Sequence, residues 1–164
     1  MPALLAETFS WLEQTRFANE VRIVPHLYPV LMSVHVLGIA LMIGSAFIVD
    51  LRLMGYGRGT IPVTVVARSL LPLSRAGFFI VLVTGLTMFA AVAFTVGSSG
   101  AARWKLVLII LAGLNILLFH GGVFRGVAAW DLHAPTPVSA KVAAFMSMVA
   151  WTGVIFAGRF LAYS

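Results

Sequence analysis

HLYPVLMSVHVLGIALMIGSAFIV, residues 26–49, is the most informative segment of this chain for its fold. It contains no Asp, Glu, Lys or Arg. It is also longer than the roughly 20 residues that a helix needs to cross the hydrocarbon core of a bilayer. Pro25 and Pro29 fall at its start, where a missing backbone N–H costs little. The segment therefore predicts a membrane-spanning α-helix.

Three further apolar stretches of similar length follow along the chain. The second begins after Pro72 and the fourth follows the break APTP, so that we predict spans over about residues 73–96, 104–124 and 139–162. Of all residues, 61% are hydrophobic and only 10% are charged, whereas about a quarter are charged in an ordinary soluble protein. We therefore predict an all-α membrane protein, a four-transmembrane-helix bundle in which residues 1–164 form a single membrane domain.

The N-terminal segment has a different character. Residues 10–22, SWLEQTRFANEVR, have one apolar side but are too polar to span a bilayer. Ser10 and Glu13 fit a capping box, in which each side chain bonds an unpaired backbone N–H at a helix start. We therefore predict a short amphipathic helix at residues 10–22 that lies in the membrane interface.

Charge and cysteine content exclude several classes of function. The net charge is +6, but the basic residues fall mostly between the spans, where they face lipid headgroups. Nucleic acid is therefore not expected as a partner. There is no cysteine, which excludes disulfides, thiolate metal sites and iron–sulfur clusters.

Arginines predict the orientation in the membrane. The connection between the first two spans carries Arg52, Arg58, Arg68 and Arg75. Basic loops favour the cytoplasmic side. We therefore expect both termini to be periplasmic.

Histidines are the candidate functional residues. His35 lies well inside the first span and His120 near the inner end of the third, whereas His26 and His133 lie at or beyond span ends. Ionisable groups at membrane depth are functional candidates by default, and helix bundles hold b-type haem between facing helices through axial imidazoles. The leading hypothesis is therefore a haem b protein that transfers electrons or anchors a redox partner, with His35 and His120 as ligands. Its propionates would pair with Arg52, Arg125 or Arg159.

Depth argues against one haem that is shared by both histidines. Measured from the midpoints of their predicted spans, His35 and His120 differ by roughly 12 Å in depth. Met42 matches the depth of His120 better, and Met88 that of His35, so that His/Met sites are the alternative. The small residue Gly38, on the face of His35, would let a flat macrocycle approach.

Two other interpretations stay open. In the first, the histidines only bond neighbouring helices, as Asn115 can, and the protein is a cofactor-free subunit that scaffolds a larger complex. In the second, it transports copper or another metal ion, for which His and Met are suitable ligands and to which His26 and His133 could contribute.

No hydrolytic motif is present, so no independent catalytic activity is expected. Asp50 and Arg52 are predicted to anchor the end of the first span. Beyond the lipid bilayer, the candidate partners are a redox protein and a second copy in a homo-oligomer.

Three motifs resemble one known family. They are LYPVLMSVHVLGIALMIGSAFIVDLRLMG (27–55), AGLNILLFH (112–120) and W-x7-GR (151–159). The pattern is similar to that of an uncharacterised family of small bacterial four-span proteins, a domain of unknown function, over roughly residues 10–163. The resemblance implies the four-span fold and the bacterial inner membrane, but no activity. A looser likeness to copper-resistance D-type domains and b-type membrane cytochromes rests only on histidines in a four-helix bundle.

Overall fold

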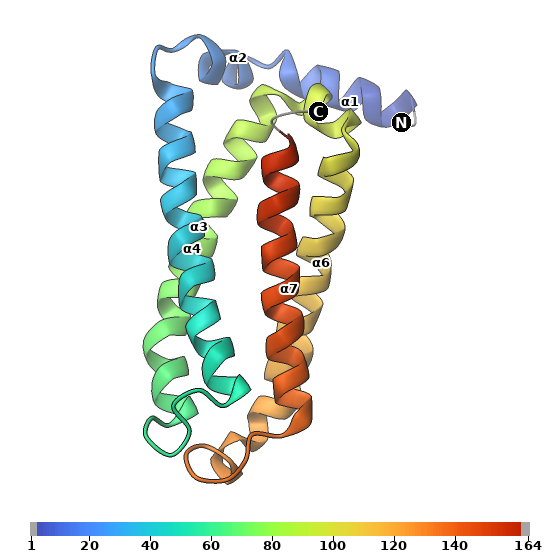
Figure 1. The fold of residues 1–164 in the computed structure, drawn as a ribbon. Coiled ribbons are helices and arrows are strands. Elements are labelled where there is room, and N and C mark those ends of the chain that lie inside the picture. The colour runs from blue at the N-terminus through green and yellow to red at the C-terminus, as the bar shows by residue number, and fades with distance from the viewer. Residues whose placement is uncertain (1–2, 162–164) are drawn as a thin grey trace.

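Four long helices make up most of the protein. The computed structural model describes residues 3–161, and within them every regular element is helical. The long helices are α3 (Leu27–Met54), α4 (Val63–Ala91), α6 (Gly100–Gly121) and α7 (Val138–Phe160). Each is long and apolar enough to cross a membrane, and they lie side by side (Figure 1). The predicted all-α fold with four membrane spans is confirmed.

The bundle is built from two helical hairpins. Helix α3 packs along α4, α6 packs along α7, and the hairpins meet where α3 packs on α7. No packed interface forms between α4 and α6, both of which are described over their full length. The start of α1 and the end of α7 lie at the same end of the bundle, as an even number of spans requires (Figure 1). The bundle is therefore open along one side.

The second span differs from its predicted bounds. Helix α4 begins at Val63, well before residue 73, and Pro72 lies inside it instead of at its start. Membrane helices tolerate an internal proline because neighbouring helices and side chains can satisfy the carbonyl that it leaves free. The helix ends at Ala91, and the short helix α5 (Ala93–Ser98) follows.

The third and fourth spans are close to their predictions. Helix α6 begins at Gly100 because the Ser99 hydroxyl accepts a hydrogen bond from the Ala101 N–H at 3.1 Å. It ends at Gly121 and is followed by a 3₁₀-helix, η1 (Val123–Ala129). Helix α7 begins one residue before the predicted start, and position 162 of that prediction lies outside the described residues.

The N-terminal segment forms two short helices instead of one. These are α1 (Ala3–Glu13) and α2 (Arg16–Ile23), which lie across the end of the bundle (Figure 1). The single helix predicted at residues 10–22 is therefore wrong in its bounds. The Arg22 guanidinium donates to the Glu13 carbonyl oxygen at 2.7 Å, which ties the two helices together.

The predicted capping box is also wrong. Ser10 lies inside α1, where its hydroxyl donates to the Glu7 carbonyl at 2.9 Å. The residue that caps a helix is Thr15, whose hydroxyl accepts from the Ala18 N–H at 3.2 Å at the start of α2. A β-hydroxyl next to a break in the helix satisfies an unpaired N–H there, whereas Ser10 inside a helix has no unpaired N–H to reach.

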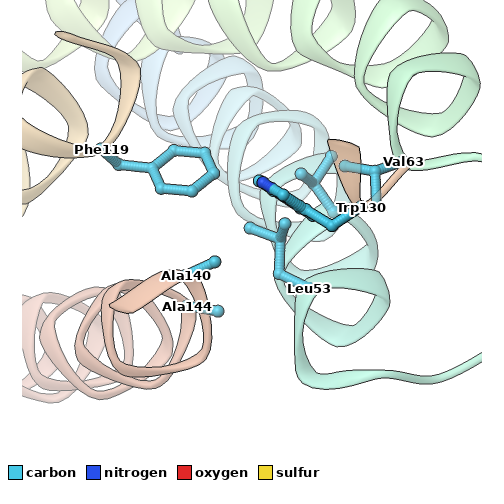
Figure 2. Close-up of a cluster of buried hydrophobic side chains, with 7 residues drawn as sticks. Leu53, Val63, Phe119, Trp130, Ala140 and Ala144 are labelled. Carbon is cyan, nitrogen blue, oxygen red and sulfur yellow. The ribbon is translucent and has the colours of Figure 1, made fainter. Parts of the chain in front are cut away.

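A buried apolar cluster closes the end of the bundle that carries the α3–α4 loop. Trp130, from the connection after η1, packs with Leu53 and Val63 of the first hairpin and with Phe119 of α6 (Figure 2). Ala140 of α7 faces the same cluster. The cluster fixes both hairpins relative to each other at this end.

Helices α3 and α4 approach closely at two glycines. A Cβ atom on Gly77 would lie 2.5 Å from the Met42 backbone N and 2.8 Å from the Gly38 carbonyl oxygen. Gly38 in turn faces Ile80 of α4. Gly38 therefore serves helix packing, and the room that it was predicted to give a macrocycle is filled by α4.

Candidate functional site

A cavity of about 660 Å³ lies between α3, α4, α6 and α7. Most of its lining is apolar, and its polar side chains are Asp50, Ser74, Arg75, Asn115, His120 and Ser147. Because α4 and α6 do not pack on each other, the cavity lies beside the open edge of the bundle. A mainly apolar pocket with a few polar groups is the usual form of a small-molecule site.

Asp50 is the most unusual group in this cavity. It belongs to the last two turns of α3 and is only 7% exposed, and no hydrogen-bond donor reaches its Oδ2 within residues 3–161. The hydroxyl of Ser147 on α7 faces its carboxyl group. A buried carboxyl group without a full set of partners is costly to keep. The predicted role of Asp50 as an interfacial anchor does not explain this placement.

Arg52 lies on the other side of α3 and does anchor the chain. Its Nε donates to the Ile61 carbonyl at 2.6 Å and its Nη2 to the Asp131 carbonyl at 2.9 Å. Two residues along a helix turn a side chain by about 200°, so that Asp50 and Arg52 face different surroundings. Arg52 therefore joins the two connecting loops and does not line the cavity.

Asp131 completes the junction between the loops. Its carboxylate accepts from the Thr64 N–H at 2.8 Å and from the Thr64 hydroxyl at 2.7 Å. Burial raises the pKa of Asp131, but the bonds from Thr64 and the charge of Arg52 outweigh it, so that the pKa lies below its ordinary value. The junction thus caps the start of α4 with a carboxylate.

Arg75 is a cavity residue that sequence reasoning did not single out. It was counted only toward the charge of the connection between the first two spans, although it falls at the start of the span predicted over residues 73–96. The structure places it well inside α4, where it is exposed and lines the cavity. Its neighbour Ser74 donates to the Met42 carbonyl at 3.0 Å, which aligns Arg75 with the depth of Met42.

His35 bonds two helices and lies outside the cavity lining. Its Nδ1 lies 2.8 Å from the Thr84 hydroxyl of α4. That hydroxyl donates to the Ile80 carbonyl at 2.6 Å, so Nδ1 carries the proton and donates to Thr84. A Cβ on Gly85 would lie 3.1 Å from the His35 ring, so that glycine makes room for the imidazole.

His120 does line the cavity. Its Nδ1 donates to the Ile116 carbonyl at 3.0 Å, because a carbonyl can only accept. The ring packs against Phe119 and Phe124 with centroids 5.3 and 5.4 Å apart. In the neutral ring this bond leaves the lone pair on Nε2, the arrangement found in metal-ligating histidines.

The structure does not bring the predicted ligands together. His35 faces α4, whereas His120 lies at the far end of α6. Met42 clusters with Ala112, eight residues before His120, so that Met42 and His120 differ by about 12 Å in depth. Met88, one turn after Thr84, is 9% exposed and lies outside the cavity lining.

The remaining predicted residues lie at the ends of the bundle. His26 directly precedes α3 with a positive φ of 64°, and His133 lies in the connection before α7, and both are exposed. Arg125 is exposed in η1, and Arg159 is exposed in the last turn of α7, at the opposite end. Within residues 3–161, no three His, Asp or Glu side chains are grouped so that they could hold a metal ion.

Comparison with known proteins gives one match. A family model described as "Family of unknown function (DUF6644)" matches residues 9–164. No curated protein and no solved structure matches the chain.

Proposed function

The chain belongs to this family of unknown function, and from its cavity we propose that this integral membrane protein binds a small, largely apolar molecule between α3, α4, α6 and α7. One observation carries the proposal. The cavity of about 660 Å³ combines an apolar lining with a buried carboxyl group that has no full set of partners. Its volume falls in the range of about 300–1,000 Å³ that is typical of ligand pockets.

The specific occupant that the sequence favours is b-type haem, which would supply one-electron transfer to a redox partner. The state of His120 supports it, because Nδ1 is bonded to Ile116 and Nε2 is available. Met42 lies too far in depth to be the second ligand, so that His120 would act alone. Arg75, which lines the cavity, and Arg125, which lies in η1, would pair with the propionates.

An absorption spectrum tests this occupant. The protein is purified in detergent from cells supplied with haem, and His120→Ala is compared with His35→Ala. We expect a Soret band that is lost in His120→Ala and kept in His35→Ala, because only His120 lines the cavity. Matched controls are His26→Ala and His133→Ala, which change exposed histidines at the ends of the bundle. A colourless wild-type protein would remove haem as the occupant, and loss of the band only in His35→Ala would move the site to His35 and Met88.

We further propose the bacterial cytoplasmic membrane as the location, with both termini periplasmic. The support is the arginine content of the α3–α4 side. Arg52, Arg58 and Arg68 lie at the loop end of this hairpin, where basic residues favour the cytoplasm.

A second candidate function is a cofactor-free membrane subunit. Two polar contacts between helices favour it, His35 with Thr84 and the Asn115 side-chain amide with the Ala143 carbonyl at 2.9 Å. Bonds of this kind hold membrane helices together without a ligand. A colourless protein that copurifies with a stoichiometric partner protein in mild detergent would support it. Metal-ion transport has less support, because within residues 3–161 no three His, Asp or Glu side chains lie close enough together to hold a metal ion.

A further inference from the structure

Two side chains of opposite charge line the same cavity without pairing. Asp50 of α3 and Arg75 of α4 are both in the lining. No salt bridge joins them, and within residues 3–161 the Oδ2 atom of Asp50 has no donor. Opposite charges at membrane depth normally pair with each other or with a ligand.

General helix geometry directs the two side chains toward a common level. Ser74 bonds to Met42, so that Arg75 starts near the depth of Met42, and Asp50 lies eight residues further along α3, about 12 Å deeper. Helical side chains lean toward the N-terminus of their own helix. Because α3 and α4 are antiparallel, Arg75 leans toward the loop end and Asp50 leans away from it. Their charged groups therefore approach one another more closely than their backbones do.

The open edge of the bundle gives a route from the lipid. The cavity receives side chains from α4, such as Phe78, and from α6, such as Ile116 and Leu117. These two helices share no packed interface. An acyl chain can therefore leave the cavity sideways into the bilayer, whereas a water-soluble ligand would have to cross lipid or the loop end.

From these features we propose that the cavity is a headgroup site for an aminophospholipid such as phosphatidylethanolamine. Its ammonium donates to the Asp50 carboxylate, its phosphate accepts from the Arg75 guanidinium, and its acyl chains pass between α4 and α6. This inference rests on the proposed binding cavity and names a lipid in place of haem as its occupant, since both ligands would use Arg75.

The headgroup chemistry explains why an ammonium with N–H bonds is required. Oδ2 of Asp50 lacks a donor, and a buried acceptor is satisfied only by a hydrogen bond. The trimethylated choline headgroup carries the same charge but no N–H. Phosphatidylglycerol has the phosphate for Arg75 but no cation for Asp50.

Native mass spectrometry of the full chain tests the proposal. Wild-type protein in detergent is mixed with equal amounts of phosphatidylethanolamine, phosphatidylcholine and phosphatidylglycerol. Since a hydrogen bond between charged groups is among the stronger ones, we expect about a tenfold preference for the ethanolamine lipid over the choline lipid. Asp50→Asn should lose that preference, and Arg75→Gln should weaken retention of all three lipids. The matched control is Arg68→Gln on the same helix, which is exposed and outside the cavity lining.

The wild-type comparison needs no variant, because the two lipids differ only in the methyl groups on nitrogen. Equal retention of both lipids by wild-type protein would overturn the inference, as would an ethanolamine preference that survives in Asp50→Asn. If the lipids are equally retained but haem gives a Soret band that depends on His120, the lipid inference fails and the binding cavity stands. If no lipid is selected and no haem binds, both fail.

Discussion

Replacing Gly77 by alanine should destabilise the bundle, because the added methyl group meets backbone. Its Cβ would lie 2.5 Å from the Met42 nitrogen, 2.8 Å from the Gly38 oxygen and 2.9 Å from the Met42 Cα. Ordinary contacts begin near 3.5 Å, so that α3 and α4 would have to separate by about 1 Å. Overpacking of this kind costs about 1–3 kcal/mol, and backbone atoms cannot rotate away. Alanine returns up to about 1 kcal/mol of helix propensity, which leaves a net loss of about 1 kcal/mol from the middle of that range.

Gly44 provides the matched control. It lies in α3, is exposed, and has no atom within 4 Å of the position that an added methyl group would take. Gly44→Ala should therefore be neutral or stabilise by about 0.5–1 kcal/mol. Both variants are compared by titration from mild detergent into SDS, followed by circular dichroism. If Gly77→Ala is as stable as wild type, the close approach of α3 and α4 is refuted. The placement of Arg75 at the depth of Met42 depends on that approach.

Three other predictions address the helix contacts, the loop junction and the topology. Thr84→Val leaves the His35 Nδ1–H without its acceptor and should cost about 0.6–2 kcal/mol in the same titration, whereas Thr87→Val, which removes an exposed hydroxyl bonded within its own helix, should change nothing. Because the pKa of Asp131 is below its ordinary 3.8 in the folded protein, its stabilising effect is present above that pH and is lost as the pH falls through the lowered pKa; acid titration should show this loss in wild type and not in Asp131→Asn. Reporter fusions after Arg58 and at the C-terminus should report cytoplasm and periplasm, and the reverse pattern would overturn the orientation.

The number of spans could be predicted from the local sequence, but the exact ends of the helices could not. The apolar runs predicted the number and approximate place of the spans, since their length and lack of charge leave lipid as the only solvent that accepts them. Pro72 made the predicted start of the second span wrong. Proline stops a helix in water, but a membrane helix tolerates it where neighbouring groups satisfy the carbonyl that it leaves free. As a result, the prediction placed Arg75 at the very start of the second span, whereas it lies well inside α4.

The candidate site depended on contacts that no local pattern encodes. Local spacing made His35 and His120 comparable, yet His35 bonds Thr84, forty-nine residues away, and only His120 lines the cavity. Asp50 and Arg52 looked like one interfacial pair, but the bundle turns Arg52 to the loop carbonyls and Asp50 into the cavity.

The local sequence alone predicts a four-span α-helical membrane protein, because lipid requires each helix separately to be long, apolar and internally hydrogen-bonded. It does not define which helices touch. Helix packing in the folded protein keeps α4 and α6 apart, brings α3 and α4 together at Gly38 and Gly77, and turns Asp50 into the cavity that Arg75 also lines. These features arise from how helices cross and rotate against one another, and that geometry depends on pairs of residues far apart in the chain.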